Sequence, residues 1–243
     1  MFFSGHLMGI TAENISKQFN ITRQMQDEFA LASHQKAAKA VESNLFKEEI
    51  IPIEIINKKQ TIIFNQDETI RSDANIESLA KLRPAFDKGG VVTAGNSSSI
   101  NDGAACLMVA SEDAVKKHNL KPLVRIVSYP QAGVDPSIMG TGPVPAARKA
   151  LATAGWTVQD LDLIESNEAF AAQAIYVNQE MNWDLDKVNI NGGGIALGHP
   201  IGASGAKILV TLIHQMKRIN AKKGLATLCI GGGMGIAICV ENI

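Results

Sequence analysis

From residue 91 onward, short apolar segments alternate with segments of helical spacing, and this alternation constrains the fold more than any other feature of the sequence. Capping residues and apolar spacing predict helices at residues 111–118, 143–155, 168–179 and 203–219. Strands are expected at residues 104–110, 123–129, 161–165, 188–190, 225–230 and 235–240. An alternation of this kind is typical of an α/β protein built in layers.

Residues 1–90 are more polar, and their pattern is mainly helical. Thr11 is a suitable N-cap for a short helix, and Thr22 for a longer helix that continues to position 44. His34 and Gln35 fall towards the edge of the apolar face of this second helix, so we expect both to be solvated.

An edge hairpin and then a long irregular segment are expected after these helices. Residues 50–56 alternate around Pro52 and residues 61–64 are rich in β-branched side chains, as in a short hairpin at a sheet edge. Residues 65–90 show no clear periodicity, and segments of this kind more often bind ligands than pack a core.

The composition excludes several classes of protein. Lys and Arg number 23 against 24 Asp and Glu, so no general excess of positive charge attracts nucleic acid or an anionic membrane. The first residues, MFFSGHLMG, lack the features of a secretion signal, and glycines interrupt the longest apolar stretch. The three cysteines, an odd number, are expected to be thiols in a reducing compartment. We therefore expect a soluble, cytoplasmic, globular protein.

The glycine-rich segment NGGGIALGHPIGASGA, residues 191–206, is the first candidate site. His199 lies inside it, between a predicted strand and a predicted helix, where its near-neutral pKa would suit proton transfer. The alternative is a tight connection with an incidental histidine, but the nearby helix N-terminus favours a functional interpretation. Neither the dinucleotide fingerprint G-x-G-x-x-G nor the P-loop pattern is present in it.

The segment LATLCIGGGMG, residues 225–235, is the second candidate. Cys229 lies at the end of an apolar strand, where a thiol can face a substrate in dry surroundings, and the amide of Gly231 could bind an oxyanion. A buried structural thiol is an equally good interpretation of this stretch alone. Cys106 and Cys239 lie within apolar runs and are expected in the core, and no metal-ligand spacing is present.

Asn167 and Glu168 form the third candidate, directly after the strand predicted at residues 161–165. Asn167 could be only a helix N-cap. The carboxyl end of a strand is also where open α/β sheets bind ligands. The spacing alone leaves both interpretations open.

Taken together, these stretches resemble the thiolase family, and most closely its biosynthetic acetyl-CoA acetyltransferases. The matching signatures are NEAF at residues 167–170, GHP at 198–200 and CIGGG at 229–233. Further matches are MGITAEN at 8–14, KLRPAF at 81–86, TAGNSSSINDGAA at 93–105 and VDPSIMGTGPVPA at 134–146. The resemblance covers essentially the whole chain, and it implies the layered α-β-α thiolase fold.

The resemblance also implies an activity, a Claisen-type exchange between two acetyl-CoA molecules and acetoacetyl-CoA plus free CoA. By resemblance, His199 activates the nucleophilic cysteine and contributes to the first oxyanion hole, in which Asn167 holds a water molecule. Cys229 is then the acid/base cysteine, and Gly231 a backbone donor of the second oxyanion hole. The positions that match the CoA cleft are Ser98, Arg71, Phe86, Met139 and Phe170. Coenzyme A thioesters are the substrates, and neither a cofactor nor a metal ion is implied.

The main departure from the family concerns the nucleophile. Thiolases carry the nucleophilic cysteine in the first half of the chain, and none of the three cysteines here stands in that context. The resemblance therefore predicts that residues 1–90 are the mainly helical loop segment on the CoA side and that residues 91–120 are the remainder of the N-terminal domain. Residues 121–243 would be a complete C-terminal domain, and the half with the nucleophile would be absent.

Two smaller departures and a rival function follow. Leu7 stands where the biosynthetic enzymes usually have a histidine, and Ser99 stands where glycine is common. Residues 91–93 and 104–110 would expose unpaired strand edges, so we expect a homo-oligomer or a complementing N-terminal half as partner. The rival is a non-catalytic remnant or assembly subunit that binds at most CoA.

Overall fold

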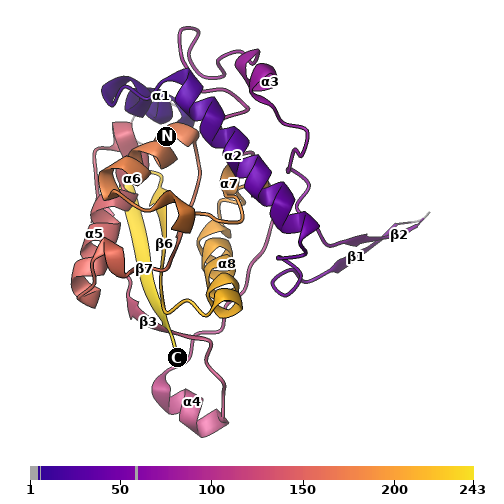
Figure 1. The fold of residues 1–243 in the computed structure, drawn as a ribbon, viewed down its shortest axis with the longest axis vertical. Coiled ribbons are helices and arrows are strands. Elements are labelled where there is room, and N and C mark those ends of the chain that lie inside the picture. The colour runs from indigo at the N-terminus through magenta and orange to yellow at the C-terminus, as the bar shows by residue number, and fades with distance from the viewer. Residues whose placement is uncertain (1–4, 6, 58–59) are drawn as a thin grey trace.

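A computed structural model describes residues 5, 7–57 and 60–243, and its centre is a five-stranded sheet (Figure 1). The strands of this sheet are β3 (Val124–Ser128), β4 (Gln131–Gly133), β5 (Leu163–Ser166), β6 (Lys223–Ile230) and β7 (Met234–Asn242). Their order is β3-β7-β6-β5, with β4 also paired to β7. Only β5 and β6 run parallel, so both strands have their carboxyl ends at the same edge of the sheet.

Eight α-helices surround the sheet or extend from it in the described part of the chain. They are α1 (Met8–Gln18), α2 (Arg23–Glu42), α3 (Ile76–Ala80), α4 (Glu112–His118), α5 (Pro143–Ala154), α6 (Ala171–Met181), α7 (Gly194–Leu197) and α8 (Ser204–Ile219). A separate two-stranded hairpin is formed by β1 (Ile53–Ile56) and β2 (Thr61–Phe64), and it projects from the body of the molecule (Figure 1). None of these described helices is both long enough and apolar enough to cross a membrane.

The alternation of side chains along the strands produces the layers. Leu225 packs against α5 and α6, whereas Ala226, the next residue, packs against α8. Cys239 and Val240 of β7 divide between the two faces in the same way. Since successive strand residues point to opposite faces, an uninterrupted apolar strand needs helices on both sides. The α/β class and the three-layer arrangement predicted above are thereby confirmed.

Several element boundaries follow from the predicted signals. Thr22 caps α2 and accepts a hydrogen bond from the Met25 backbone, and Ser111 caps α4 in the same way. Pro143 is the first residue of α5, and Gly155 ends that helix in the left-handed conformation. The short hairpin is also present, but it forms a separate two-stranded sheet rather than the edge of a larger one. These features are local, so the sequence is sufficient to predict them.

Some predictions about elements are wrong. Thr11 lies inside α1 rather than at its N-cap, and its hydroxyl donates to the Met8 carbonyl. Residues 188–190 form only an isolated bridge between Val188 and Ile164 instead of a strand. The segment from 65 to 90 contains the short helix α3, whose N-cap is Asn75.

Residues 104–110 form no strand, and Cys106 is exposed rather than in the core. Met108 in the same segment is 86% exposed. A strand needs a neighbour to satisfy its backbone hydrogen bonds, and no described strand pairs with this segment. The apolar run therefore indicates strand propensity without a partner to pair with.

Candidate active site

The segment from Asn96 to Asn101 brings two of the predicted motifs together. Ser97 forms a bridge with Phe170, and the Ser98 backbone N–H donates to the Ala169 carbonyl at 3.0 Å. Two residues further along, Ile100 forms a bridge with His199. The NEAF and GHP motifs, about 30 residues apart in sequence, thus contact one short stretch of chain.

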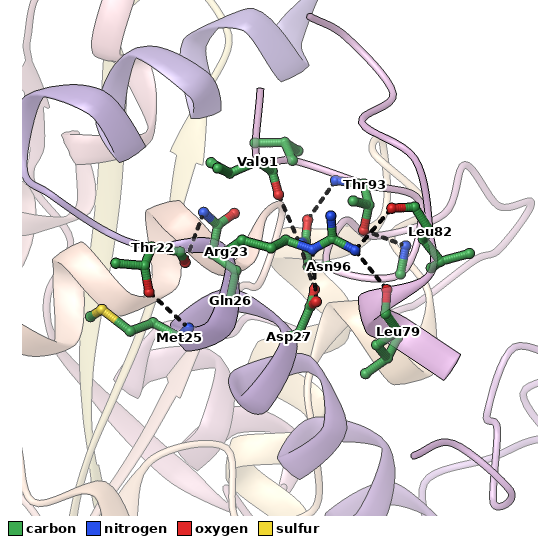
Figure 2. A network of polar contacts seen from close by, with 12 residues as sticks. Thr22, Arg23, Met25, Gln26, Asp27, Leu79, Leu82, Val91, Thr93 and Asn96 are labelled. Atoms are coloured by element: carbon green, nitrogen blue, oxygen red, sulfur yellow. Dashed lines mark hydrogen bonds and ion pairs between the residues drawn. The ribbon is translucent and has the colours of Figure 1, made fainter. Parts of the chain in front are cut away.

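A buried network on α2 holds this segment in place (Figure 2). Asp27 accepts hydrogen bonds from Arg23 at 2.7 Å and from Asn96 at 2.9 Å. Asn96 also bonds the Val91 carbonyl and the Thr93 backbone N–H. The other end of the Arg23 guanidinium donates to backbone carbonyls at the end of α3, so α2, α3 and the segment are tied together (Figure 2).

The parallel strands place Asn167 beside the segment that contains Cys229. Asn167 follows β5 directly, and its backbone N–H donates to the Thr227 carbonyl of β6 at 2.9 Å. Thr227 and Cys229 are two residues apart on that strand, so their side chains point to the same face of the sheet. Asn167 Oδ1 also lies next to the Gly194 backbone of α7. All three predicted motifs therefore lie at one edge of the sheet.

The side chain of Asn167 has an unused donor. Its Nδ2 is buried and has no hydrogen-bond partner in the described structure. Buried amide groups are nearly always hydrogen-bonded, so this atom is suited to an oxygen of water or of a ligand. Phe170, and not Asn167, is the N-cap of α6, so the interpretation as a simple cap is wrong.

Glu168 is buried and anchors the surroundings of the site. Its carboxylate accepts from Ser33 Oγ at 2.7 Å, from Asn189 Nδ2 at 2.9 Å and from the Ile195 backbone at 3.3 Å. Burial raises the pKa of this carboxyl, while the hydrogen bonds from Ser33 and Asn189 oppose the rise. Glu168 thus connects the end of β5 to α2 and to the glycine-rich turn.

His199 lies in the turn between α7 and α8 and is held on both sides. Its backbone N–H donates to Asn101 Oδ1 at 2.9 Å, and its Nδ1 lies 2.5 Å from Ser204 Oγ. Gly198 has a φ of +86°, and a Cβ there would lie 2.6 Å from Asn101 Oδ1. A larger residue would therefore be strained and would push Asn101 away from His199. An open hollow of about 420 Å³ flanks the turn, lined by residues 101–105, 200–203 and 206.

The hydrogen bonds of Ser204 indicate which ring nitrogen of His199 carries the proton. The Ser204 hydroxyl donates its single hydrogen to the Pro200 carbonyl at 2.9 Å, so its oxygen accepts from Nδ1–H of the ring. Burial and then Lys207 lower the pKa of His199 below its usual value of 6.5. The imidazole is therefore neutral at pH 7, and Nε2 has a free lone pair for a proton.

Cys229 lies near the end of β6, opposite Gly235 of β7. Its side chain is half-buried and packs against an apolar cluster that includes Met139 and Phe170. Burial raises the pKa of the thiol to about 12, so the group is protonated at neutral pH. Gly231, two residues further along, is exposed at the turn, and a Cβ there would meet nothing within 4 Å.

The structure brings together most of the residues predicted for the CoA cleft. Phe86 and Phe170 are in edge-to-face contact, with ring centroids 6.0 Å apart, and both belong to the cluster with Met139 and Cys229. Ser98 Oγ donates to the Ala169 carbonyl at 2.9 Å and so lies next to the NEAF motif.

Arg71 is the exception among these cleft residues. It lies in the segment that packs against α2, where its backbone N–H donates to His34 Nδ1 at 3.2 Å and its side chain is exposed. His34 itself is only 5% exposed, so the prediction that it is solvated is wrong.

Sequence reasoning missed several supporting residues. Asn101, Ser204, Ser33 and Asn189 each hold a predicted site residue or its motif through a hydrogen bond. Asn101 and Ser204 lie within segments quoted for the resemblance, but neither has a spacing that indicates its partner. Among the described residues, no group of three or more His, Cys, Asp or Glu side chains could hold a metal ion.

The sequence matches two models of one family across most of its length. Residues 1–113 match the thiolase N-terminal domain, and residues 120–242 match the thiolase C-terminal domain. The chain therefore belongs to the thiolase family. The fold and the three motifs at the sheet edge agree with this assignment.

Within the family, similar relatives carry one name. The chain is 57% identical over 241 residues to an acetyl-CoA acetyltransferase of Rhizobium meliloti and 56% identical over 239 residues to one of Escherichia coli. These alignments cover 99% and 98% of this chain but 61% of each relative. The chain thus spans about three fifths of the length of the relatives it matches.

Solved structures of two related proteins superimpose on nearly the whole chain. The crystal structure of the Bacillus anthracis acetyl-CoA acetyltransferase superimposes with a TM-score of 0.97 at 51% identity, covering 99% of this chain and 61% of that one. Human mitochondrial 3-ketoacyl-CoA thiolase in complex with CoA superimposes with a TM-score of 0.89 at 45% identity, over 97% of this chain and 59% of that one.

Proposed function

We propose that this chain carries the acid/base half of an acyltransferase site of the thiolase type, which acts on acetyl-CoA and acetoacetyl-CoA. The observation that carries the proposal is the meeting of the His199 turn, Asn167 and the end of β6 at one sheet edge. The names of the relatives support the substrate class. The nucleophile is assigned to a segment outside this sequence, because none of the three cysteines stands in the context of a thiolase nucleophile.

His199 and Asn167 are assigned to the acyl-transfer step. Nε2 of the neutral imidazole takes the proton from the thiol of the nucleophilic cysteine, while Ser204 holds Nδ1 on the opposite side of the ring. Once protonated, Nε2–H can donate to the oxyanion that forms on the substrate carbonyl. The free Nδ2 donor of Asn167 can hold a water molecule as the second donor.

Cys229 is assigned to proton transfer at the α-carbon. When the thiolate of the nucleophilic cysteine, assigned to a segment outside this sequence, adds to C3 of acetoacetyl-CoA, the bond between C2 and C3 breaks. The acetyl group stays on that sulfur as a thioester, to be passed to CoA, and the electron pair remains on the departing acetyl-CoA as an enolate. The protonated thiol of Cys229 donates its hydrogen to that carbon. The backbone N–H of Gly231 is assigned to the enolate oxygen, since a fixed donor stabilises that charge without reorganisation.

The CoA portion is assigned to the apolar cluster that Phe86, Met139 and Phe170 share with Cys229. Ser98 is proposed to contact the pantetheine arm, and Arg71 to line the outer part of the cleft. We assign residues 1–90 to the loop segment, residues 91–120 to the remainder of the N-terminal domain and residues 121–243 to the C-terminal domain. The proposed location is the cytoplasm, and the proposed partners are further copies of the chain or a complementing N-terminal half.

The test is a thiolysis assay with acetoacetyl-CoA and CoA. The 243-residue chain is assayed alone and after refolding with the N-terminal portion of the Rhizobium meliloti relative that this chain does not span. We expect turnover only in the mixture. His199→Ala and Cys229→Ala should each lower that turnover by ~10²–10⁴-fold, because each removes a proton-transfer group.

Cys106→Ala is the matched control, because it removes a thiol outside the site and should leave the rate of the mixture unchanged. Turnover by the chain alone would show that the nucleophile lies within it and would overturn that part of the proposal. If the assembled mixture is inactive but the chain binds CoA in isothermal titration, the non-catalytic alternative is correct.

A further inference from the structure

Three consecutive backbone carbonyls precede His199, and each accepts a hydrogen bond from a side chain. Thr69 Oγ1 donates to the Ala196 carbonyl at 2.6 Å. Lys207 Nζ donates to the Leu197 and Gly198 carbonyls, both at 3.1 Å. These carbonyls belong to the end of α7 and its cap, where backbone acceptors have no partner within the helix.

Lys207 therefore has a defined place in the first turn of α8, behind the His199 turn. Four carboxyl groups contribute to the electrostatic environment of its ammonium group: Asp67 from the segment after β2, Glu165 from β5, Glu49 from the turn after α2, and Glu168. Burial raises the pKa of each of these four groups. Burial lowers the pKa of Lys207, and these carboxyl groups oppose that change when they are ionised. The ammonium group itself lies against the carbonyls that directly precede His199.

We propose that Lys207 is a positioning residue for His199: its ammonium group binds the two carbonyls that directly precede the imidazole and places a positive charge behind that ring. This inference rests on the proposed acyl-transfer function, because that function requires a neutral His199. An ammonium group has three donors and no acceptor, so it can hold both carbonyls at once while its charge repels an imidazolium.

A purely structural role would look different. A lysine that only caps α7 would stabilise the helix end and would leave the titration of His199 unaffected. Among the described residues, Lys207 adds to burial in lowering the pKa of His199. The charge of Lys207, rather than its hydrogen bonds alone, is therefore the feature to remove.

The experiment measures the protonation of His199 directly, by NMR of ¹⁵N-histidine-labelled protein across pH 5–8. The chain has five histidines, and His199→Gln identifies the signal by its disappearance. The ring of the unmodified chain should titrate below pH 6.5 and carry its proton on Nδ1. Lys207→Gln keeps a hydrogen-bond donor but removes the charge, so the midpoint should move upward. Lys207→Arg keeps both features and should leave the midpoint in place.

Lys217→Met is the matched control, because it removes an exposed positive charge from the same helix. This variant should not move the His199 midpoint. The inference is overturned if Lys207→Gln leaves the midpoint unchanged. Should the glutamine variant fail to fold, Lys207→Met, which keeps the apolar stem, is subject to the same criterion.

This measurement is independent of turnover. A midpoint that moves in Lys207→Gln, together with an inactive assembled mixture, would support the role of Lys207 and refute the acyl-transfer proposal. If the midpoint stays in place in Lys207→Gln while the assembled mixture is active, the role of Lys207 is refuted and the acyl-transfer proposal is supported. The two failures are therefore distinguishable.

Discussion

Burial decides the charge state of the individual side chains at and behind the site. Burial lowers the pKa of His199 and raises that of Cys229 to about 12, so at pH 7 both groups are further from their charged forms than they would be in water. Each change disfavours the charged form, as expected where water is displaced by protein. Packing is therefore the main cause of the pKa change at both residues that carry the proposed chemistry.

Glu49 shows the same effect at a position with consequences for stability. Burial raises the pKa of this carboxyl from 4.5 to about 7, against a hydrogen bond from Thr211 that lowers it. The folded state therefore holds a proton that the unfolded state releases between about pH 4.5 and 7. The contribution of Glu49 to stability is present below pH 4.5 and is lost as the pH rises through 7.

We expect Glu49→Gln to remove this pH dependence. The unfolding free energy of the unmodified chain should fall as the pH rises from 5 to 8, so the variant should gain ~1–2 kcal/mol relative to it over that range. The full change in the pKa of Glu49 corresponds to at most ~3 kcal/mol, and the partial exposure of the side chain reduces this amount. Urea unfolding at both pH values measures the difference. The exposed neighbour Glu48 provides the control, and an equal gain in Glu48→Gln would contradict the explanation.

At the scale of the elements, α2 is the helix that organises the site. It supplies Asp27 to the segment that contacts both motifs and Ser33 to the buried carboxylate of Glu168. Ser33 also accepts the backbone N–H of Gly193 at 3.0 Å. These polar residues are buried on the packed face of the helix. The spacing of apolar residues therefore predicts that face only in part.

Asp27→Ala should be strongly destabilising. It removes the acceptor shared by Arg23 and Asn96, and it leaves their donors buried or half-buried without a carboxylate (Figure 2). We expect a loss of ~3 kcal/mol in the unfolding free energy, measured by urea denaturation.

Glu28→Ala, on the exposed side of the same helix, should change that energy by less than ~0.5 kcal/mol. A similar loss in both variants would mean that the network contributes nothing beyond helix propensity.

At the scale of the whole molecule, the β1–β2 hairpin extends away from the body (Figure 1). All eight of its strand residues are exposed. Ile55 pairs directly with Ile62, and Ile53 with Phe64, so these four side chains share one face. A two-stranded hairpin of this kind is marginal by itself and exposes apolar surface that favours association.

We expect the chain to associate through this hairpin. Light scattering should give a mass above 25.9 kDa that rises with concentration. The double variant Ile55→Glu, Ile62→Lys keeps an attractive cross-strand pair but replaces half of the apolar face with charges, and it should reduce the mass to that of the monomer.

Leu185→Glu changes a single exposed apolar residue elsewhere and should have no effect. A monomeric mass for the unmodified chain at every concentration would contradict this prediction.

Much of the fold and of the candidate site could be predicted because the signals were local. Thr22, Ser111, Pro143 and Gly155 act on their own helix ends, and the two faces of β6 and β7 follow from their uninterrupted apolar runs. The three motifs could be located because each stands at the end of a strand or in a glycine-rich turn, where ligands bind in α/β sheets.

The remaining features depended on what packs against each residue. The same kind of apolar run is buried in β6 but exposed at residues 104–110, because only the former has neighbouring strands in the described structure. His34 and Lys207 have polar side chains of the kind that usually face water, and the segment after α2 and the His199 turn cover them. The sequence alone determined the layers, the helix ends and the motifs, since these depend on periodicity and on neighbours along the chain. Only the tertiary structure decided which polar groups are buried and how they are charged, because desolvation is set by contacts between residues far apart in sequence.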